Sequence, residues 1–259
     1  MGIPGLLIAA VLLAVGGCAS APAPRPSSSA PSEEVRGSLG RIGVHAGPTT
    51  ASGEWNLPAK GAAEGAKRGA GVGFGSTLRG SSAILSPLGA LVGGIAGAAA
   101  AESAEVVEQA ETAIKAAFTA AALQTTLCDR VLQVARLETR HPMMPAAQLG
   151  GTVAPGTRPE EPPGSLDTAL EIQVQRYGTK AAATPNPPVH LFFNAQVALR
   201  RVADGSVVYT QRFSWLSPGR PITAWAAAEG EAVRHALDGG LQALAERIVD
   251  VVFLVRSVP

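Results

Sequence analysis

The sequence predicts an α+β protein: a mostly antiparallel four-stranded sheet with two long helices on one face and an inserted glycine-rich helical hairpin. Three observations lead to this prediction. Several segments alternate apolar and polar residues, as strands with one buried face do. Two long segments repeat apolar residues with the period of a helix. Glycine recurs at every fourth position in two separate runs within residues 59–101. We expect one domain over residues 37–259, with a Pro/Gly-rich loop at about 140–166.

The strands are predicted from alternation. "LGRIGVHAG", residues 39–47, predicts a first short strand. Three more are expected after the loop, one around residues 170–175, one over 189–200 and one over 207–215. "ADGS", residues 203–206, carries the Asp-Gly signal of a tight turn between the last two. The order favours antiparallel pairing, with one sheet face covered by helices.

The two long helices are predicted from apolar stripes. The first continues the second glycine run and ends near residue 139, with a face formed by Val107, Ala110, Ile114, Ala117, Ala121, Cys128, Leu132 and Ala135. The second begins near Thr223, a plausible N-cap. Its stripe consists of Val233, Leu237, Leu241, Leu244, Ile248, Val251 and Val255. We expect Trp225 to pack over the sheet and Cys128 to be a buried, unreactive thiol.

The N-terminus predicts export. Residues 6–15, "LLIAAVLLAV", are apolar but too short to span a bilayer, and no Lys or Arg precedes them. They lead to "VGGCAS", which resembles the bacterial lipobox and implies lipidation of Cys18. By the same resemblance, Ala19 favours the outer membrane. Residues 1–17 are then a signal peptide, and residues 18–36 are a flexible Pro/Ser/Ala tether that carries the lipid anchor. With Cys18 lipidated, Cys128 has no partner for an intramolecular disulfide.

The glycine repeats predict close helix packing. Gly61, Gly65, Gly69 and Gly73 form one run, and Gly89, Gly93 and Gly97 form another. Glycine at this spacing leaves a groove along one helix face, into which a second helix can pack backbone to backbone. The pattern resembles the glycine-zipper segments of bacterial envelope proteins. It implies a hairpin of two arms, which could form a homo-oligomer.

The surroundings of this hairpin stay open at the level of sequence. Residues 83–101 carry no charge and are near the length that spans a bilayer. The first arm carries Glu64, Lys67 and Arg68, which are costly inside a membrane. An inserted hairpin, a partner-facing hairpin and a buried intradomain hairpin are all compatible with these features.

The residues that could carry chemistry form no recognisable site. The histidines, His45, His141, His190 and His235, have no metal-ligand spacing, and no nucleophile elbow or phosphate loop occurs. Glu102, Glu105, Glu108 and Glu111 predict a solvated helix face. Arg200 and Arg201 are expected to be edge-strand charges. The net charge of +1 and 4% aromatic residues argue against nucleic-acid binding. We therefore expect no enzyme, no metal and no cofactor.

The last third of the chain, "FFNAQVALRRVADGSVVYTQRFSW" followed by "TAWAAAEGEAVRHALDGGLQALAERIVDVVF", forms a strand, turn, strand and Trp-led helix. This layout resembles the curli secretion-channel, penicillin-binding-protein activator and transport auxiliary lipoproteins. The resemblance implies a non-catalytic binding, scaffold or assembly role at the periplasmic face of the outer membrane, with an envelope protein as partner. One alternative is a membrane-inserted glycine-zipper oligomer that forms a pore or conduit. A weaker alternative is an enzyme whose site is not recognised.

Overall fold

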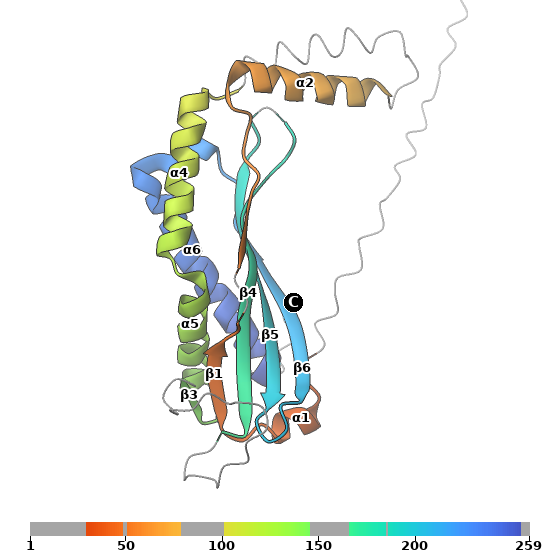
Figure 1. The fold of residues 1–259 in the computed structure, drawn as a ribbon, viewed down its shortest axis with the longest axis vertical. Coiled ribbons are helices and arrows are strands. Elements are labelled where there is room, and N and C mark those ends of the chain that lie inside the picture. Colours follow the sequence, from red (N-terminus) through yellow and green to blue (C-terminus); the bar gives the residue numbers. More distant parts are fainter. Residues whose placement is uncertain (1–29, 49–50, 79–100, 146–165, 185, 255–259) are drawn as a thin grey trace, which may run out of the picture.

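Three helices lie on one face of a mixed sheet, and a further helix extends sideways from one end of this assembly (Figure 1). The computed structural model describes residues 30–48, 51–78, 101–145, 166–184 and 186–254. The strands are β1 Ile42–Ala46, β2 Ser52–Trp55, β3 Met143–Pro145, β4 Thr168–Ala181, β5 Val189–Arg201 and β6 Val207–Leu216. The helices are α1 Glu33–Gly37, α2 Gly61–Leu78, α4 Ala104–Ala120, α5 Leu123–Glu138 and α6 Ile222–Val249, which continues as a π-helical turn over Asp250–Leu254. α1 begins within the stretch assigned to the tether, and Ser32 caps it.

The sheet has the strand order β3-β1-β4-β5-β6, with β2 also pairing with β4. β5 is antiparallel to both β4 and β6. β1 and β2 are parallel to β4, and β3 is parallel to β1. The expected four-stranded, mostly antiparallel sheet is therefore wrong in strand number and in pairing. Parallel strands are joined by long crossover connections and not by tight turns. The sequence therefore contains no local turn motif from which this parallel pairing could be predicted.

The predicted hairpin between the last two strands is confirmed. Gly205 adopts a φ of +70°, which is the left-handed conformation that glycine accepts without strain. The Asp204 carboxylate accepts hydrogen bonds from the backbone N and the hydroxyl of Ser206, at 2.9 and 2.6 Å. Local chemistry alone specifies this turn.

The first long helix is broken in two. Ala122 has a φ of 42°, so α4 ends at Ala120 and α5 begins at Leu123. The break lets the second half turn toward the sheet. There the Gln124 side chain donates to the carbonyl of Ile172 at 2.6 Å and accepts from the backbone N of Val174 at 2.7 Å. These two groups of β4 lie between the end of β1 and the start of β2. The Ile172 carbonyl also accepts from the backbone N of Gly47 at 2.8 Å, so the Gln124 amide takes the place of a missing strand neighbour at the N–H of Val174.

The last helix also differs from the prediction. It is capped by Pro221, with Thr223 inside the first turn. Residues 227–230 depart from helical geometry, and three of them have positive φ. Gly230 is one of these three. A Cβ at Gly230 would lie 3.2 Å from the carbonyl oxygen of Ala113 on α4, so the backbone conformation and the close approach of α4 both favour glycine at this position. The α6 stripe itself is confirmed, because its members from Val233 to Val251 are all buried, while Val255 lies outside the described residues.

The core fills the space between the sheet and the helices, as expected from the alternating strands. Trp225 is 1% exposed, and its indole N–H donates to the carbonyl of Val189 on β5 at 2.8 Å, which confirms its predicted place over the sheet. Cys128 is half-buried at the edge of this core, and burial raises the pKa of its thiol to about 12. At neutral pH the thiol is therefore protonated, which supports the expected low reactivity, but Cys128 is partly and not fully buried.

Candidate functional site: the base of the glycine-rich helix

α2 is joined to the rest of the molecule at its N-terminal end, and from there it extends sideways (Figure 1). We call α2 the arm. We call the junction that residues 57–68 form with α4 the arm base. The predicted first hairpin arm, residues 59–78, is confirmed as a helix. The second arm, with Gly89, Gly93 and Gly97, lies outside the described residues, as does Cys18.

The first two glycines of the repeat lie in the arm base. Gly61 has a φ of +77°, and its backbone N donates to the carbonyl of Glu102 at 2.9 Å. A Cβ on Gly61 would lie 3.7 Å from the Cβ of Ala104 at the start of α4. Gly65, one turn further, is buried. The need for glycine at Gly61 therefore comes from its backbone conformation, because a Cβ there would make only ordinary van der Waals contact with Ala104.

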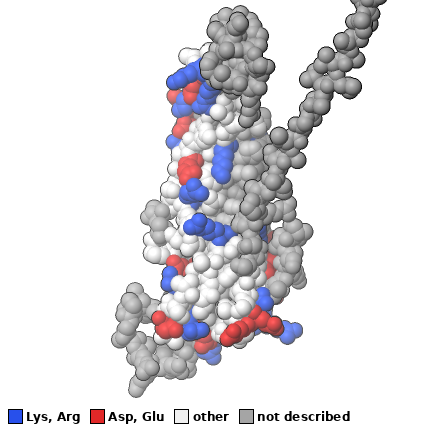
Figure 2. All heavy atoms as spheres, turned by 90° about the vertical axis from the view of Figure 1, so that its right-hand side faces the viewer, with Lys and Arg blue, Asp and Glu red and all other residues white. Residues whose placement is uncertain are grey.

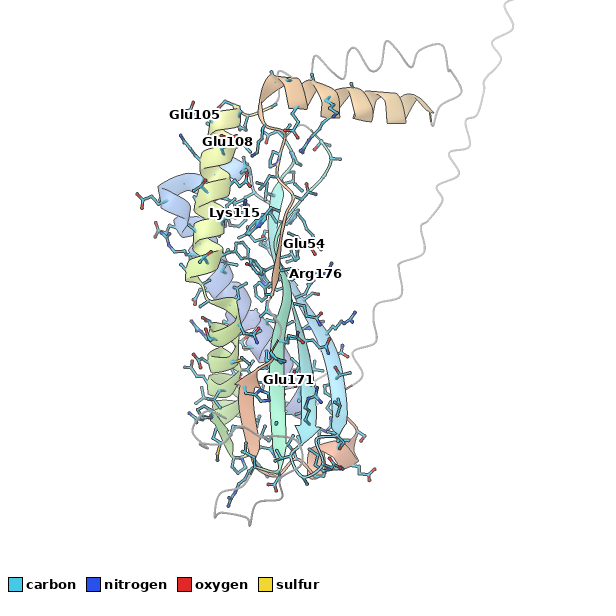
Figure 3. The ribbon with its side chains drawn as sticks, viewed as in Figure 1. Glu54, Glu105, Glu108, Lys115, Glu171 and Arg176 are labelled. Atoms are coloured by element: carbon cyan, nitrogen blue, oxygen red, sulfur yellow. The ribbon has the colours of Figure 1, made fainter. Side chains whose placement is uncertain are left out.

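A network of charged side chains holds the arm base. The ammonium of Lys60 lies 2.9 Å from the carboxylate of Glu111 on α4, and Lys115 lies 2.6 Å from the same carboxylate. Lys115 also lies over the ring of Trp55, at 5.5 Å from the centroid. One carboxylate thus links the residue before the arm to the middle of α4, and α4 carries Glu105, Glu108 and Lys115 along the same stretch (Figure 3).

A second set of contacts fixes the first turns of the arm. The Glu64 carboxylate accepts from the backbone N of Lys60 at 2.7 Å and pairs with Arg68 at 2.7 Å. Arg68 also donates to the carbonyl of Leu57 at 2.9 Å. Leu57 is buried, so these contacts tie the arm to the end of the core. Lys67, which the sequence groups with Glu64 and Arg68, is exposed.

The electrostatics of the arm base favour the charged forms of its groups. Hydrogen bonds from Lys115 and then Lys60 lower the pKa of Glu111 below its usual value. The backbone N of Lys60, followed by Arg68, lowers the pKa of Glu64. The hydrogen bond to Glu111 raises the pKa of Lys60. All three groups are therefore ionised at neutral pH, and they hold the arm through charge-assisted hydrogen bonds.

Sequence reasoning did not identify Lys60 or Glu111 as partners. Glu111 was expected on a solvated face, and its neighbours Glu105 and Glu108 are indeed exposed. The Glu111 side chain is only 20% exposed because two lysines cover it. Lys60 and Glu111 are separated by 51 residues, a distance at which no periodic pattern in the sequence connects them.

Gly69 and Gly73 lie further along the arm. Both are within the α2 helix, and their surroundings are outside the described side chains. Among the described residues, no helix has both the length and the apolar character needed to cross a bilayer.

The described part of the chain brings no metal-ligand group together. Its histidines lie on separate elements, and no three His, Cys, Asp or Glu side chains in residues 30–48, 51–78, 101–145, 166–184 and 186–254 could hold a metal ion. The imidazole of His190 is engaged with the backbone, with Nδ1 at 2.9 Å from the carbonyl oxygen of Ser217.

Arg200 pairs with Glu171 at 2.7 Å and Arg201 with Asp204 at 3.4 Å, so both arginines interact within the sheet and its turn. Arg200 is on β5, which is an inner strand and not the expected edge.

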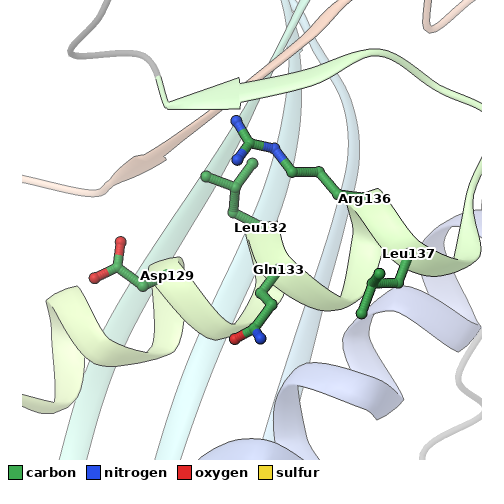
Figure 4. A pocket seen from close by; sticks show the side chains of 5 residues that line it. All are labelled: Asp129, Leu132, Gln133, Arg136 and Leu137. Carbon is green, nitrogen blue, oxygen red and sulfur yellow. The ribbon is translucent and has the colours of Figure 1, made fainter.

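The hollows in the surface are shallow. One, of about 260 Å³, lies on α5 and is lined by Asp129, Leu132, Gln133, Arg136 and Leu137 (Figure 4). All five residues come from two to three turns of one helix. The guanidinium of Arg136 already donates to the carbonyl of Met143 at 3.1 Å. A wider groove between α4 and the bend in α6, of about 620 Å³, is lined by Glu108, Gln109, Thr112, Ala113, Ala116, Glu229 and Arg234.

No family model matches the sequence, and no curated protein matches it. A Xanthomonas campestris protein assigned to family DUF330 is 17% identical over 49% of this chain and 58% of its own length, with a TM-score of 0.33. The PelC dodecamer from Paraburkholderia phytofirmans is 11% identical over 50% of this chain and 76% of its own, with a TM-score of 0.32. Lipoprotein GNA1162 from Neisseria meningitidis is 20% identical over 42% of this chain and 76% of its own, with a TM-score of 0.24. At such low TM-scores and identities, these likenesses assign neither a family nor a function to the chain.

Proposed function

We propose that this chain is a non-catalytic envelope lipoprotein that acts as a periplasmic binding, scaffold or assembly factor. Lipidated Cys18 anchors it to the outer membrane, and the arm contacts a partner. The anchor is supported by the residues around Cys18. The contact is supported by the geometry of α2, which is held at one end and directed away from the sheet and the other helices (Figure 1).

The contacts of the arm base stabilise the first turns of α2, whose own helical stability is low. A helix this rich in glycine has little intrinsic stability, because each glycine costs about 1 kcal/mol relative to alanine. The contacts of Lys60, Glu64 and Arg68 fix its first two turns. The remaining ten residues, 69–78, continue the helix for about 15 Å at 1.5 Å per residue. A partner helix that packs on the glycine-bearing side would complete it.

Alkaline-carbonate extraction tests the anchor. The native protein and a Cys18→Ala version, exported by a non-lipoprotein signal, would be compared in bacterial membranes. We expect the unlipidated protein to be released, because the lipid is its attachment to the membrane. Retention of the unlipidated protein would contradict this and would favour the membrane-inserted pore or conduit.

Cross-linking tests the arm. Gly73→Leu fills the glycine-bearing side beyond the arm base, and Ala63→Leu adds the same side chain at an exposed position on another side of the helix. We expect Gly73→Leu to reduce the cross-linked species of the full chain, whether homo-oligomer or complex, by at least about tenfold. Ala63→Leu should leave it unchanged. Equal cross-linking in both variants would rule out the arm as the contact.

A further inference from the structure

The face of the sheet that points away from the helices is a second candidate surface. α5 and α6 pack on the opposite face, and no described helix lies over this one (Figure 1). Alternate residues of β4, β5 and β6 point to this face. Most of them are polar and are half-buried or exposed, whereas most residues on the opposite face are apolar and buried. We call the face that points away from the helices the open face.

Four cations follow one another along the open face. The strand register places Lys180 beside His190, Arg176 beside Asn194, and Arg212 beside Gln196. Arg200 follows four positions further along β5. The ten-residue separation between the rows of Lys180 and Arg200 corresponds to about 33 Å at 3.3 Å per residue. Figure 2 shows Lys and Arg side chains succeeding one another along this side of the molecule. The cations thus form a linear track that runs parallel to the strands.

In the described part of the chain, two carboxylates on this face pair with cations of the track. Glu54 lies 3.3 Å from Arg176, and Glu171 lies 2.7 Å from Arg200. Figure 3 shows Glu54 and Arg176 close together, with Glu171 further along the sheet. Among the described residues, Lys180 and Arg212 take part in no ion pair, and both are exposed. The ammonium of Lys180 lies over the ring of Phe192, at 4.6 Å from its centroid. The face therefore keeps two uncompensated positive charges.

Amide and hydroxyl groups lie between Arg176, Arg212 and Arg200, while the apolar pair Phe192 and Leu216 lies between Lys180 and Arg176. The open face carries Gln173, Gln175, Asn194, Gln196, Thr210 and Ser214. Gln175 donates to Gln196 at 2.7 Å, which leaves the second N–H of Gln175 and the N–H₂ group of Gln196 available. Each primary amide offers donors and an acceptor side by side, which suits the neighbouring hydroxyl groups of a sugar.

We infer that the open face binds an extended acidic polysaccharide along the cation track. The carboxylates of such a chain would pair with Lys180 and Arg212, and its hydroxyl groups would bond the amides between them. An acidic protein segment fits less well, because hot spots of protein interfaces are enriched in Trp and Tyr. Phe192 on this face is only 2% exposed, and its exposed neighbour Leu216 is aliphatic. A bilayer fits less well because a twisted sheet presents a line of charges and not a plane.

The test measures binding of the full chain to polygalacturonate, with neutral dextran as the uncharged control. We expect polygalacturonate to bind, dextran not to bind, and the affinity to fall when salt rises from about 50 to 200 mM. The double variant Lys180→Gln/Arg212→Gln should lose at least about fivefold in affinity, since each exposed ionic contact contributes a small factor. Lys67→Gln/Arg234→Gln removes the same charge from exposed positions on α2 and α6, and it should bind like the native chain.

Two results would overturn the inference. One is equal polygalacturonate binding by both double variants, which would mean that net charge and not the track is responsible. The other is binding to vesicles containing phosphatidylglycerol without binding to polygalacturonate, which would indicate a lipid surface. The inference is independent of the arm, because Gly73→Leu leaves the open face intact and should retain polygalacturonate binding even if it loses cross-linking.

Discussion

The sheet with its covering helices and the arm are stabilised by different physical means. The first region buries large side chains completely, among them Trp225, Phe193 and Ile172 at 1% exposure or less. Among the described side-chain positions of the arm, Gly65 is the one that is buried, and the arm base depends on ion pairs and charge-assisted hydrogen bonds around Glu64 and Glu111. Apolar burial is non-directional and insensitive to pH, whereas these carboxylate contacts are directional and pH-dependent. The two regions should therefore respond to different perturbations.

The largest effect is expected in the core. Trp225→Ala removes a fully buried indole and one of the two hydrogen bonds to the carbonyl of Val189, which keeps the bond from the backbone N of Arg220. Large-to-small substitutions of this kind cost about 3–5 kcal/mol. Urea unfolding followed by circular dichroism measures the change. Leu137→Ala is the matched control, because Leu137 is 80% exposed and its truncation should change the free energy of unfolding by less than about 0.5 kcal/mol. Similar losses in both variants would contradict the core described above.

A smaller loss is expected at the gap between β1 and β2. Gln124→Leu keeps the size of the side chain but removes both hydrogen bonds to β4, at Ile172 and Val174. The Ile172 carbonyl keeps its bond from the backbone N of Gly47, but the partly buried N–H of Val174 loses its acceptor, which costs about 1–3 kcal/mol. Gln133→Leu makes the same exchange at an exposed position on the same helix and should be nearly neutral. An unchanged denaturant midpoint in Gln124→Leu would show that water replaces this amide without cost.

The smallest effect on global stability is expected at the arm base. Glu111→Gln breaks the ion pairs to Lys60 and Lys115, and solvent screening limits the cost to about 1 kcal/mol or less. Such a loss of local stability speeds amide hydrogen exchange of residues 61–68 by up to about fivefold, with the exchange of β4 and β5 unchanged. Glu105→Gln, at an exposed position on the same helix, is the control. Faster exchange throughout the sheet would show that the arm base and the core unfold together.

The same contacts predict a pH dependence. The folded pKa values of Glu64 and Glu111 lie below their usual value of 4.5, so their stabilising contribution is complete above that value. It is lost as the pH falls through the lowered folded values. The pKa of Lys60 is raised above 10.5, so its contribution is lost only when the pH rises beyond that value. Hydrogen exchange of residues 61–68 in the native chain should therefore increase below about pH 4, relative to that of β5, and Glu111→Gln should show a smaller increase.

Patterns of neighbouring residues predicted much of the fold. Apolar and polar residues alternate along residues 170–175, 189–200 and 207–215, because one face of each strand packs on the helices, and this alternation identified β4, β5 and β6. The Asp-Gly pair identified the turn between the last two strands. The stripe of α6 was correct for the same reason, since each member repeats with the period of the helix that buries it.

The candidate site was predictable only in part. Glycine spacing identified the arm as a helix, but it did not reveal that Gly61 and Gly65 lie in the junction with the domain. The cation track was missed because its members come from three strands, and only the sheet register aligns them. Arg200 alone drew attention, as a presumed edge charge.

By itself, the sequence determined the features that depend on neighbouring residues: the periods of β4, β5, β6 and α6, the turn at Gly205, and the place of Cys128 on an apolar stripe. Tertiary structure decided the parallel pairing of β1, β2 and β3, the break at Ala122 and the contact of Lys60 with Glu111. Those features join groups that lie far apart in the chain. Their free energy comes from satisfying backbone donors and acceptors and charged groups in three dimensions, which no repeat along the chain records.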